Sequence, residues 1–371
     1  MSKTAFRDLL DQAGKSDLTP LRDAALNAET PVHLLDEPIT PVSRFFVRNN
    51  GQVPSFDDAQ LKNWTLTLDG EVEHPLTLSL AELRSRFQIV TEEAVLECAG
   101  NGRHNYSPPT EGLQWGDGAV GCARWTGLRL ADLLMAAGLK PSARYTAHFS
   151  ADPCVDGDGP ALSRGLPLWK ALSPETLLAF EMNGQPLTLL HGAPLRIVAP
   201  GFPGSAWQKW IHRITLRDRE HDGAKMTGYD YRLPSRPLRP GEVPPASEMA
   251  VMEDMPVKSL IVSPASGGSL QAGRPTEITG FAWSGHVPLA GLELSMDAGR
   301  SWRPVPLRPP ASRFAWVPFS LSWTPGDTGE TTILSRARDA RGGIQPVDDA
   351  PWNPKGYANN RCHRVTVMVA A

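Results

Sequence analysis

The sequence contains few cysteines, no long apolar segment and little net charge. Its four cysteines, at positions 98, 122, 154 and 362, include no C-x-x-C pair, which argues against a thiolate zinc site and a disulfide framework and fits a cytosolic protein. No run reaches the length of about 18 apolar residues that a membrane-spanning helix needs. The formal net charge of −3 offers no electrostatic footprint for nucleic acid or an anionic membrane. We therefore expect neither as a partner.

Motifs of other enzyme classes are also missing. The sequence has no G-x-G-x-x-G fingerprint and no P-loop, so nothing supports a nicotinamide or nucleotide enzyme. The N-terminal residues have neither an apolar signal region nor a twin arginine. We expect a cytoplasmic protein, or a periplasmic one if a leader precedes this sequence.

Proline and glycine, in contrast, are abundant, with 35 and 33 residues, which indicates many turns and much β-structure. A chain of 371 residues is too long for one ordinary core and suits two domains. We expect an N-terminal extension at 1–40, opening with a short amphipathic helix and too short for a haem domain. An α+β domain at 41–235, a proline-rich linker at 236–258 and a β-sandwich at 259–371 follow.

Local patterns predict several elements within this plan. Residues 64–68 alternate as a strand, and the capping-box sequence from Ser79 to Glu82 predicts a short helix that reaches Phe87. Residues 89–97 predict a strand, and residues 130–137 a helix that Gly138 ends. Further strands are expected at 194–200, 210–216, 259–263, 276–283, 290–296, 331–338 and 363–369.

Cys98 is the first candidate for chemistry. It follows the predicted strand 89–97, is followed by Gly100 and Gly102, which let the backbone bend, and lies five residues before Arg103. Three interpretations fit: a small buried cysteine in a turn, a nucleophile paired with His104 or His191, or a ligand for a soft metal.

Basic and aromatic residues occur at four other places where an anion or a polar cofactor could bind. Arg48 lies between aromatic and amide side chains, His191 and Arg196 bracket the start of a predicted strand, and Lys209 lies between tryptophan neighbours. Tyr231 lies directly before the linker. Each of these residues taken alone also fits an ordinary structural role.

Taken in order, the motifs resemble the sulfite oxidase family of molybdopterin enzymes. The resemblance covers residues 41–371. Its motifs are FVRN at 46–49, ECAGN at 97–101, ARWTG at 123–127, EMNGQP at 181–186, HGAPLR at 191–196, KW at 209–210, ARD at 337–339, QP at 345–346 and WNPKGY at 352–357. It implies an α+β molybdopterin domain followed by an immunoglobulin-like β-sandwich that forms homodimers.

The resemblance also implies a role for individual residues. Cys98 would bind molybdenum. The pterin and its phosphate would contact Phe46, Val47, Arg48, Asn49, Asn50, Asp152, His191, Arg196, Trp207, Gln208 and Lys209. The catalytic pocket for sulfite would contain Arg48, Arg103, Tyr231, Trp115 and Lys355, and guanidinium groups suit the oxygens of this dianion.

Three positions depart from the family pattern. Asn50 replaces a frequent histidine, Gly102 replaces a common arginine, and Lys355 stands where animal relatives have an arginine. A lysine is a point charge rather than a bidentate donor. These changes lead us to expect weaker sulfite binding and leave open whether sulfite is the preferred substrate.

The sequence thus favours molybdenum-dependent oxidation of sulfite to sulfate. The alternatives are reduction of another oxo-substrate, nitrate or a sulfoxide, on the same scaffold, and a cofactor-free binding protein that assembles through its β-sandwich. We expect no haem in this chain, so electrons would pass to dioxygen or to a separate cytochrome.

Overall fold

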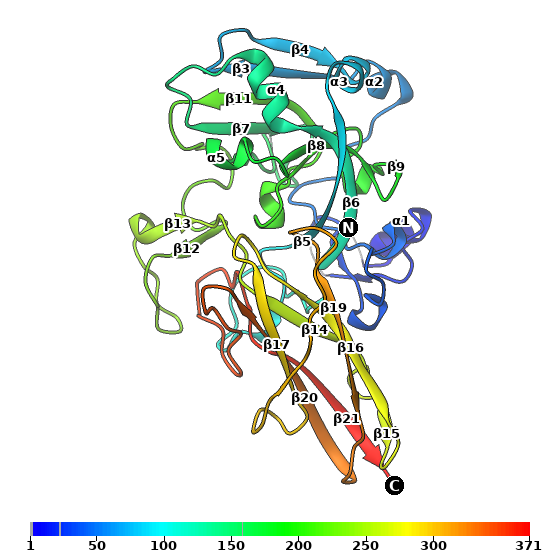
Figure 1. The fold of residues 1–371 in the computed structure, drawn as a ribbon. Helices are drawn as coiled ribbons and strands as arrows, with labels where there is room; N and C mark the ends of the chain where they lie inside the picture. The colour runs from blue at the N-terminus through cyan, green and yellow to red at the C-terminus, as the bar shows by residue number, and fades with distance from the viewer. Residues whose placement is uncertain (1–2, 22–23, 158) are drawn as a thin grey trace.

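Strands dominate the computed structural model, which describes residues 3–21, 24–157 and 159–371 (Figure 1). Helix α1 (Lys3–Gln12) confirms the amphipathic helix expected near the N-terminus, with Phe6 and Leu10 buried. After this helix in the chain, the short strands β1 (Thr19–Pro20) and β2 (Ala28–Glu29) pair antiparallel with each other. The N-terminal extension is therefore packed onto the rest of the protein, where Phe6 and Leu10 share a small core with Val47.

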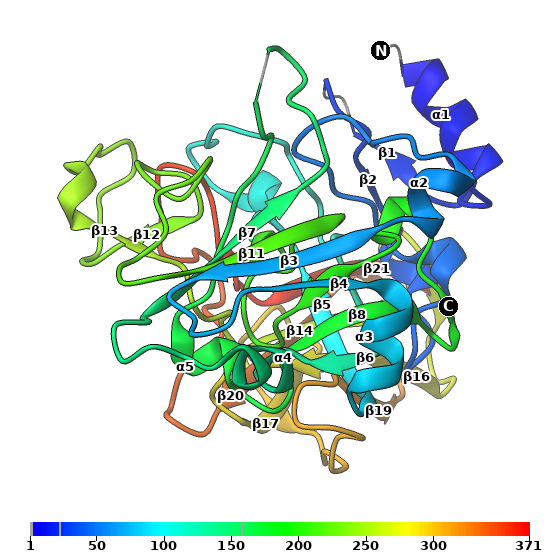
Figure 2. The same ribbon diagram turned by 90° about the horizontal axis from the view of Figure 1, so that it is seen from above.

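Two sheets build the first part of the molecule, shown at the top of Figure 1 and from above in Figure 2. One is antiparallel, with the order β10-β8-β6-β5 and β9 attached to β8; the other has the order β4-β3-β11-β7, in which β11 runs parallel to β3. Their bounds are β3 (Thr65–Gly70), β4 (Leu76–Ser79), β5 (Ile89–Glu97), β6 (Val120–Arg129), β7 (Tyr145–Ser150), β8 (Leu177–Met182), β9 (Gln185–Pro186), β10 (Arg196–Val198) and β11 (Ile211–Arg217).

The helices of this part are short. They are α2 (Asp58–Lys62), α3 (Leu80–Arg86), α4 (Leu130–Ala137) and α5 (Leu168–Ala171). Helix α3 has the expected capping box, in which Ser79 and Glu82 each bond the other's backbone N–H. Helix α4 ends at Gly138, whose φ of 68° suits a residue without a Cβ. The helical share is smaller than an α+β label suggests.

Strand β5 matches the strand predicted at 89–97, and its end sets the position of Cys98. Its outer half is partly exposed, whereas the four residues 94–97 before Cys98 are buried. The core around this end contains Trp115, Trp125 and Trp207, each at most 1% exposed. Such close packing fixes where the strand stops, so the loop that follows starts from a rigid support.

The proline-rich segment has more regular structure than predicted. Strand β12 (Arg232–Pro234) pairs antiparallel with β13 (Met249–Val251), so the segment expected as a linker at 236–258 contains a strand. Five of the prolines lie between or beyond these strands, and Pro234 occupies the last position of β12, where a missing N–H is tolerated.

Two facing sheets form the C-terminal part, at the bottom of Figure 1. One has the order β14-β16-β19 and the other β15-β21-β20-β17-β18. Their bounds are β14 (Lys258–Ser263), β15 (Ser269–Gln271), β16 (Thr276–Trp283), β17 (Leu289–Ser295), β18 (Arg303–Pro304), β19 (Val317–Trp323), β20 (Gly329–Asp339) and β21 (His363–Ala370). Apolar residues of both sheets share one core. The expected sandwich is present, and β15, β18 and β19 are additions to it.

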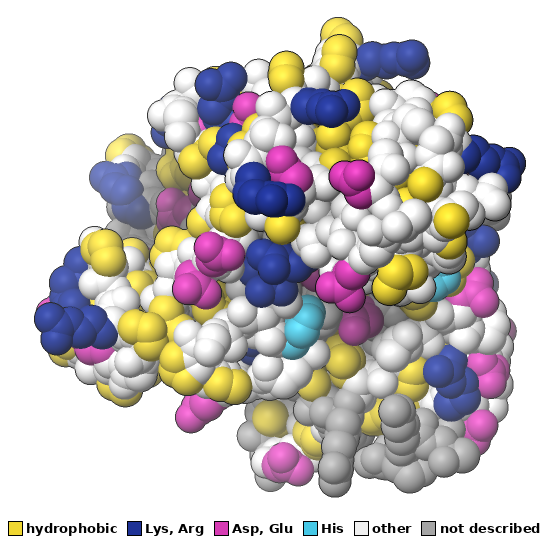
Figure 3. Space-filling model, turned by 90° about the horizontal axis from the view of Figure 1, so that it is seen from below, with side chains coloured by type: hydrophobic (Ala, Val, Ile, Leu, Met, Phe, Trp, Pro, Cys, Tyr) yellow, Lys and Arg dark blue, Asp and Glu magenta, His cyan; other side chains and the backbone are white. Residues whose placement is uncertain are grey.

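The surface mixes both signs of charge. On the face seen from below, basic and acidic side chains are interspersed (Figure 3). Across the described ranges, which omit residues 1–2, 22–23 and 158, no helix combines the length and apolar character needed to cross a bilayer.

Candidate active site

Two cavities meet at Cys98, which lies in the loop after β5 and is 7% exposed. The His191 cavity is lined by Phe46, Arg48, Asn49, Asn50, Leu96, Cys98, Asp152, Leu162, Leu190, His191, Arg196, Gly204, Ser205, Trp207, Gln208, Lys209, Trp210 and Tyr231. The Arg103 cavity is lined by Arg48, Asn50, Cys98, Gly100, Arg103, Glu111, Gly112, Leu113, Trp115, Lys225, Asp230, Tyr231, Lys355 and Tyr357. Cys98 therefore borders both spaces.

The His191 cavity concentrates positive charge. The guanidinium of Arg196 donates to the carbonyl oxygens of His191 (2.9 Å) and Trp207 (3.1 Å), and burial lowers the pKa of Arg196 to about 9. Lys209 Nζ donates to the carbonyl oxygen of Leu190 at 2.9 Å. Burial first, and then the charge of Arg196, place the pKa of Lys209 well below its ordinary value. An anion bound here would relieve this repulsion.

Unpartnered polar atoms point to the same kind of ligand. His191 Nε2 and Ser205 Oγ are buried without a hydrogen-bond partner, and both residues line this cavity. Burial lowers the pKa of His191 well below its ordinary value, which keeps its ring neutral and free to donate or accept one hydrogen bond. Buried polar groups normally have partners. The donors and charges together suit a polar group that carries a phosphate.

An acidic side chain lies in the same cavity. Asp152 is 6% exposed, and burial raises the pKa of its carboxyl group although Ser150 Oγ donates to it. Gln208 Nε2 donates to Ser150 Oγ at 2.7 Å and so ties the carboxylate to the strand-like segment before β11. Asp152, the acidic pterin contact that the resemblance implied, lies in the wall of this cavity.

Val47 is the predicted cofactor residue that the structure places elsewhere. It lines neither cavity, and its side chain packs in the small core with Phe6 and Leu10. Its backbone N–H and C=O are both bonded to Ala28, at 2.9 Å each. The role assigned to Val47 is therefore corrected: it joins the FVRN loop to the N-terminal extension, because neighbours in an extended segment point to opposite sides.

The Arg103 cavity contains the guanidinium of Arg103, which is 6% exposed. Its Nε donates to the carbonyl oxygen of Lys355 at 2.8 Å and its Nη1 to that of Leu113 at 2.7 Å. Trp115 forms a fully buried wall and packs edge-on against Phe46. Arg48, which lines both cavities, lies close enough to Asn50 for a 3.0 Å hydrogen bond.

Lys355 lines this cavity as expected, but its charge is compensated. Its Nζ lies 3.2 Å from Glu111 Oε2 and 4.0 Å from Asp230 Oδ1. The two carboxylates therefore offset the positive charge that Lys355 brings to this cavity. Neither acidic residue carried a sequence signal, because both lie outside the motifs.

Asn50 connects the two cavities. Its Oδ1 accepts hydrogen bonds from Arg48 Nη2 (3.0 Å), Lys225 Nζ (2.9 Å) and Tyr231 Oη (3.0 Å). Tyr231 has a φ of 53°, a conformation uncommon outside glycine. Sequence reasoning named Asn50 and Tyr231 but missed Lys225, which belongs to no motif.

The N-terminal extension also reaches the FVRN loop. Asn27, fully buried, accepts from the backbone N–H of Asn49 at 2.7 Å and from Arg48 Nη1 at 3.2 Å. Lys15 Nζ donates to the carbonyl oxygen of Phe45 at 2.9 Å. Residues expected to be a simple extension therefore support the loop that borders both cavities.

Of the two histidines considered as partners of a nucleophilic Cys98, His191 lines a cavity with it and His104 does not. His104 lines neither cavity, and its Nδ1 is 2.9 Å from the carbonyl oxygen of Trp115. His191 shares a cavity with Cys98, but burial first, and then its cationic neighbours, lower the pKa of its ring, so the neutral ring cannot act as a cation partner of a thiolate.

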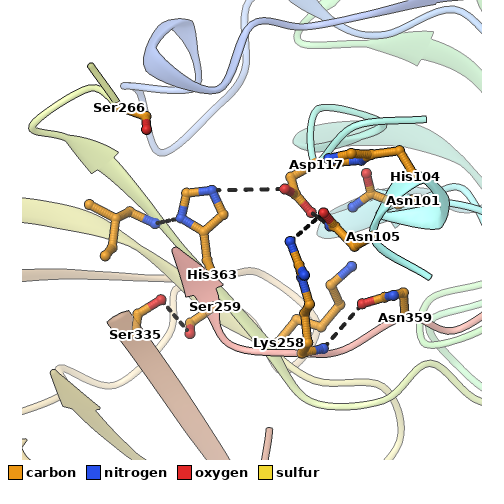
Figure 4. Close-up of polar contacts among 12 residues, drawn as sticks. Asn101, His104, Asn105, Asp117, Lys258, Ser259, Ser266, Ser335, Asn359 and His363 are labelled. Carbon is orange, nitrogen blue, oxygen red and sulfur yellow. Dashed lines mark hydrogen bonds and ion pairs between the residues drawn. The ribbon is translucent and has the colours of Figure 1, made fainter. Parts of the chain in front are cut away.

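Polar side chains of the C-terminal sheets form hydrogen bonds to Glu97, the residue before Cys98. Glu97 Oε1 accepts from Lys258 Nζ at 2.7 Å, and its Oε2 accepts from Trp283 Nε1 at 2.8 Å. In the neighbouring cluster of Figure 4, His363 Nε2 lies 4.0 Å from Asp117 Oδ2. The contacts of this cluster join the loop that carries Trp115 to the C-terminal part.

Comparisons with known proteins agree with this arrangement. Residues 50–225 match the oxidoreductase molybdopterin binding domain, and residues 249–370 match the Mo-co oxidoreductase dimerisation domain. Sulfite oxidase of Gallus gallus is 34% identical over 91% of this chain and 75% of its own length. The chain belongs to the sulfite oxidase family. Sulfite oxidase of Arabidopsis thaliana is 31% identical over 92% of each protein.

Three further proteins are similar to most of this chain, at 27–34% identity. The mitochondrial sulfite oxidase of Homo sapiens is 34% identical, and the chain spans 64% of its length. The solved sulfane dehydrogenase SoxCD from Paracoccus pantotrophus matches with a TM-score of 0.75 and 27% identity, over 94% of this chain and 88% of that one. A nitrate reductase of Fusarium oxysporum is 29% identical over 92% of this chain and 41% of its own length.

Proposed function

We propose that this sulfite oxidase family member oxidises sulfite to sulfate at a molybdenum cofactor whose metal is bound by Cys98. The observation that carries the proposal is the position of Cys98, which borders a basic cavity on one side and the Arg103 cavity on the other. When bound, the cofactor supplies oxygen-atom transfer and accepts two electrons. A thiolate is a suitable soft ligand for such a metal.

The His191 cavity is proposed to hold the pterin and its phosphate. Arg196 and Lys209 provide buried positive charge for the phosphate, and His191 and Ser205 provide unpartnered polar atoms. Asp152 provides a carboxylate for the amino groups of the pterin. This donor set fits a molecule that is anionic at one end and carries N–H groups along its edge.

The Arg103 cavity is proposed to bind the oxoanion. Arg48 from the FVRN loop and Arg103 from the loop after β5 both line this cavity. They can hold the oxygens of the oxoanion by charge-assisted hydrogen bonds. The hydroxyl of Tyr231, held by Asn50, orients a further donor at the border of both cavities. Trp115 excludes water from one wall, which strengthens these interactions.

We further propose that the C-terminal sandwich is immunoglobulin-like and joins two copies of the chain into a homodimer. The match of residues 249–370 to a dimerisation domain supports this proposal. Its test is the molar mass in sedimentation equilibrium at micromolar concentration, where a monomer alone would contradict it.

The proposed activity is tested by metal analysis and steady-state assays of the purified protein. Molybdenum at about one atom per chain and sulfite oxidation with ferricyanide are expected, and dioxygen and a cytochrome c are then compared as electron acceptors. Nitrate and methionine sulfoxide with reduced viologen form the second arm. Reduction of either one in the absence of sulfite oxidation would overturn the proposal in favour of the reductive alternative.

The ligand assignment has its own matched pair of variants. Cys98→Ser should fold and lose turnover, because an alcohol is a poor ligand for a soft metal. Cys122→Ser serves as the control, since Cys122 is buried in β6 and lines neither cavity. Full activity of the Cys98→Ser protein would refute the assignment.

A further inference from the structure

Arg103 is held in place by a loop from the opposite end of the chain. Its Nε donates to the carbonyl oxygen of Lys355, and its guanidinium carbon lies 5.2 Å from the ring centre of Tyr357. A Cβ at Gly100 would lie 2.5 Å from Arg103 Nη2, and one at Gly356 would lie 2.9 Å from Arg103 Cγ. The arginine therefore occupies a slot that glycines keep open and that residues 353–359 close.

The ring of Tyr357 contacts a second residue of the site. It stacks on Tyr231 with ring centres 5.3 Å apart and an angle of 14° between the ring planes. The guanidinium of Arg164, itself 1% exposed, lies 5.1 Å from the centre of the Tyr231 ring. Two tyrosine rings and two arginines thus form one contiguous set of cation–π and stacking contacts. Tyr357 is the member that contacts both Arg103 and Tyr231.

Tyr357 itself is fixed through its backbone. Its N–H donates to Asn353 Oδ1 at 2.9 Å, and its carbonyl oxygen accepts from Tyr106 Oη at 2.9 Å. The next residue, Ala358, donates its N–H to the carbonyl oxygen of Ala99 at 2.9 Å. Because Ala99 follows Cys98, the loop at 353–359 is attached directly to the segment that carries the proposed metal ligand.

We infer that Tyr357 is a positioning residue that aligns Arg103 and Tyr231 for the oxoanion, an inference that rests on the proposed function of the same site. Its flat ring provides the surface against which the guanidinium and the second tyrosine ring are oriented. The Arg103 side chain has two of its N–H groups bonded to backbone oxygens, so a small rotation would turn the remaining donors away from the cavity. Misplacement of this kind reduces binding of an anion more than it reduces the stability of the fold.

The role predicts that the ring matters and the hydroxyl does not. Tyr357→Phe keeps the stacking surface, whereas Tyr357→Leu removes it and keeps an apolar side chain. We expect Tyr357→Phe to stay within about twofold of the wild type, and Tyr357→Leu to raise KM for sulfite by roughly tenfold with a smaller fall in kcat. Phe319→Leu, in the core of the C-terminal sandwich, is the control for the loss of a buried ring; it should lower the melting temperature and leave KM unchanged.

A binding measurement separates this inference from the proposed activity. The product sulfate is titrated into each holoprotein by calorimetry, with molybdenum content and melting temperature measured in parallel. Weaker sulfate binding to Tyr357→Leu, with unchanged binding to Tyr357→Phe, supports the positioning role even if the wild type fails to oxidise sulfite, which would refute the activity alone. Wild-type KM and sulfate affinity in Tyr357→Leu, or equal losses in both variants, would overturn the inference. If Tyr357→Leu does not fold, Tyr357→Met is put through the same measurements and decided by the same results.

Discussion

The hydroxyl of Tyr231 donates a 3.0 Å hydrogen bond to Oδ1 of Asn50, and this single oxygen also accepts from Arg48 and Lys225. One amide oxygen thus holds three donors at the border of the two cavities. An aliphatic side chain at position 50 would release all three, although it would fit the same space. The asparagine that departs from the usual family residue is therefore integrated into the site.

Asn50→Leu should consequently lower kcat/KM for sulfite by roughly 10- to 100-fold, since hydrogen bonds to charged donors contribute about 1.5–3 kcal/mol. The measurement is steady-state kinetics on protein with matched molybdenum content. Asn183→Leu changes an asparagine that lines neither cavity and serves as a control. A wild-type kcat/KM in Asn50→Leu would show that the three donors hold their positions without this acceptor.

Lys209→Met should have opposite effects on the protein with and without its cofactor. The buried ammonium group next to Arg196 destabilises the cofactor-free protein, as the lowered pKa of Lys209 indicates. We expect the cofactor-free variant to be more stable than the wild type by about 1 kcal/mol, while its molybdenum content after purification falls several-fold. Melting temperatures and metal analysis test the two halves, and unchanged metal content would contradict a phosphate role.

Glu111→Gln should strengthen the binding of sulfite. Glu111 pairs with Lys355 at 3.2 Å and is 82% exposed, so the change removes the nearer of the two carboxylates that offset Lys355 at little structural cost. We expect KM to fall by roughly two- to fourfold at low ionic strength, and less in high salt, because exposed pairs are weak and screened. Glu330→Gln on β20 is the control. A rise in KM would mean that Glu111 contributes to substrate binding directly.

Glu29 should make stability depend on pH. Burial raises the pKa of its carboxyl group to about 7, so between the ordinary value of 4.5 and about 7 the folded state binds a proton that the unfolded state releases. Stability from this group is thus fully present below the lower value and is lost as the pH rises through the window.

Glu29→Gln should remove this loss. We expect the variant to be more stable than the wild type by up to about 3 kcal/mol at pH 8 and nearly equal to it at pH 4. Melting temperatures across this range provide the test, with the exposed Glu73→Gln as reference. Parallel curves for wild type and Glu29→Gln would contradict the assignment.

Local signals accounted for the parts of the structure that depend on neighbours in sequence. The apolar run before Cys98, the capping box at Ser79 and the glycine at position 138 each fix an element through contacts a few residues away. The same holds for four long strands of the sandwich, β14, β16, β17 and β20, and for β21, whereas the seven-residue strand β19 was not expected. Strands β15 and β18, with three and two residues, are too short to leave such a pattern.

The parts of the site that depend on distant contacts were less predictable. Tyr357 was included in a family motif without a role, because its partner Arg103 lies some 250 positions earlier in the chain. Glu111 and Lys225 belong to irregular segments without a motif. Val47 was misassigned because a motif names consecutive residues, whereas consecutive side chains face different surroundings.

The hydrogen bond from Ala358 to Ala99 means that the two parts of the chain share one cavity wall. Since a segment near residue 358 forms one side of the space around Cys98, the sandwich is more than an adaptor for pairing copies. Without the C-terminal part, the Arg103 cavity would lack Lys355 and Tyr357 and would be open on that side.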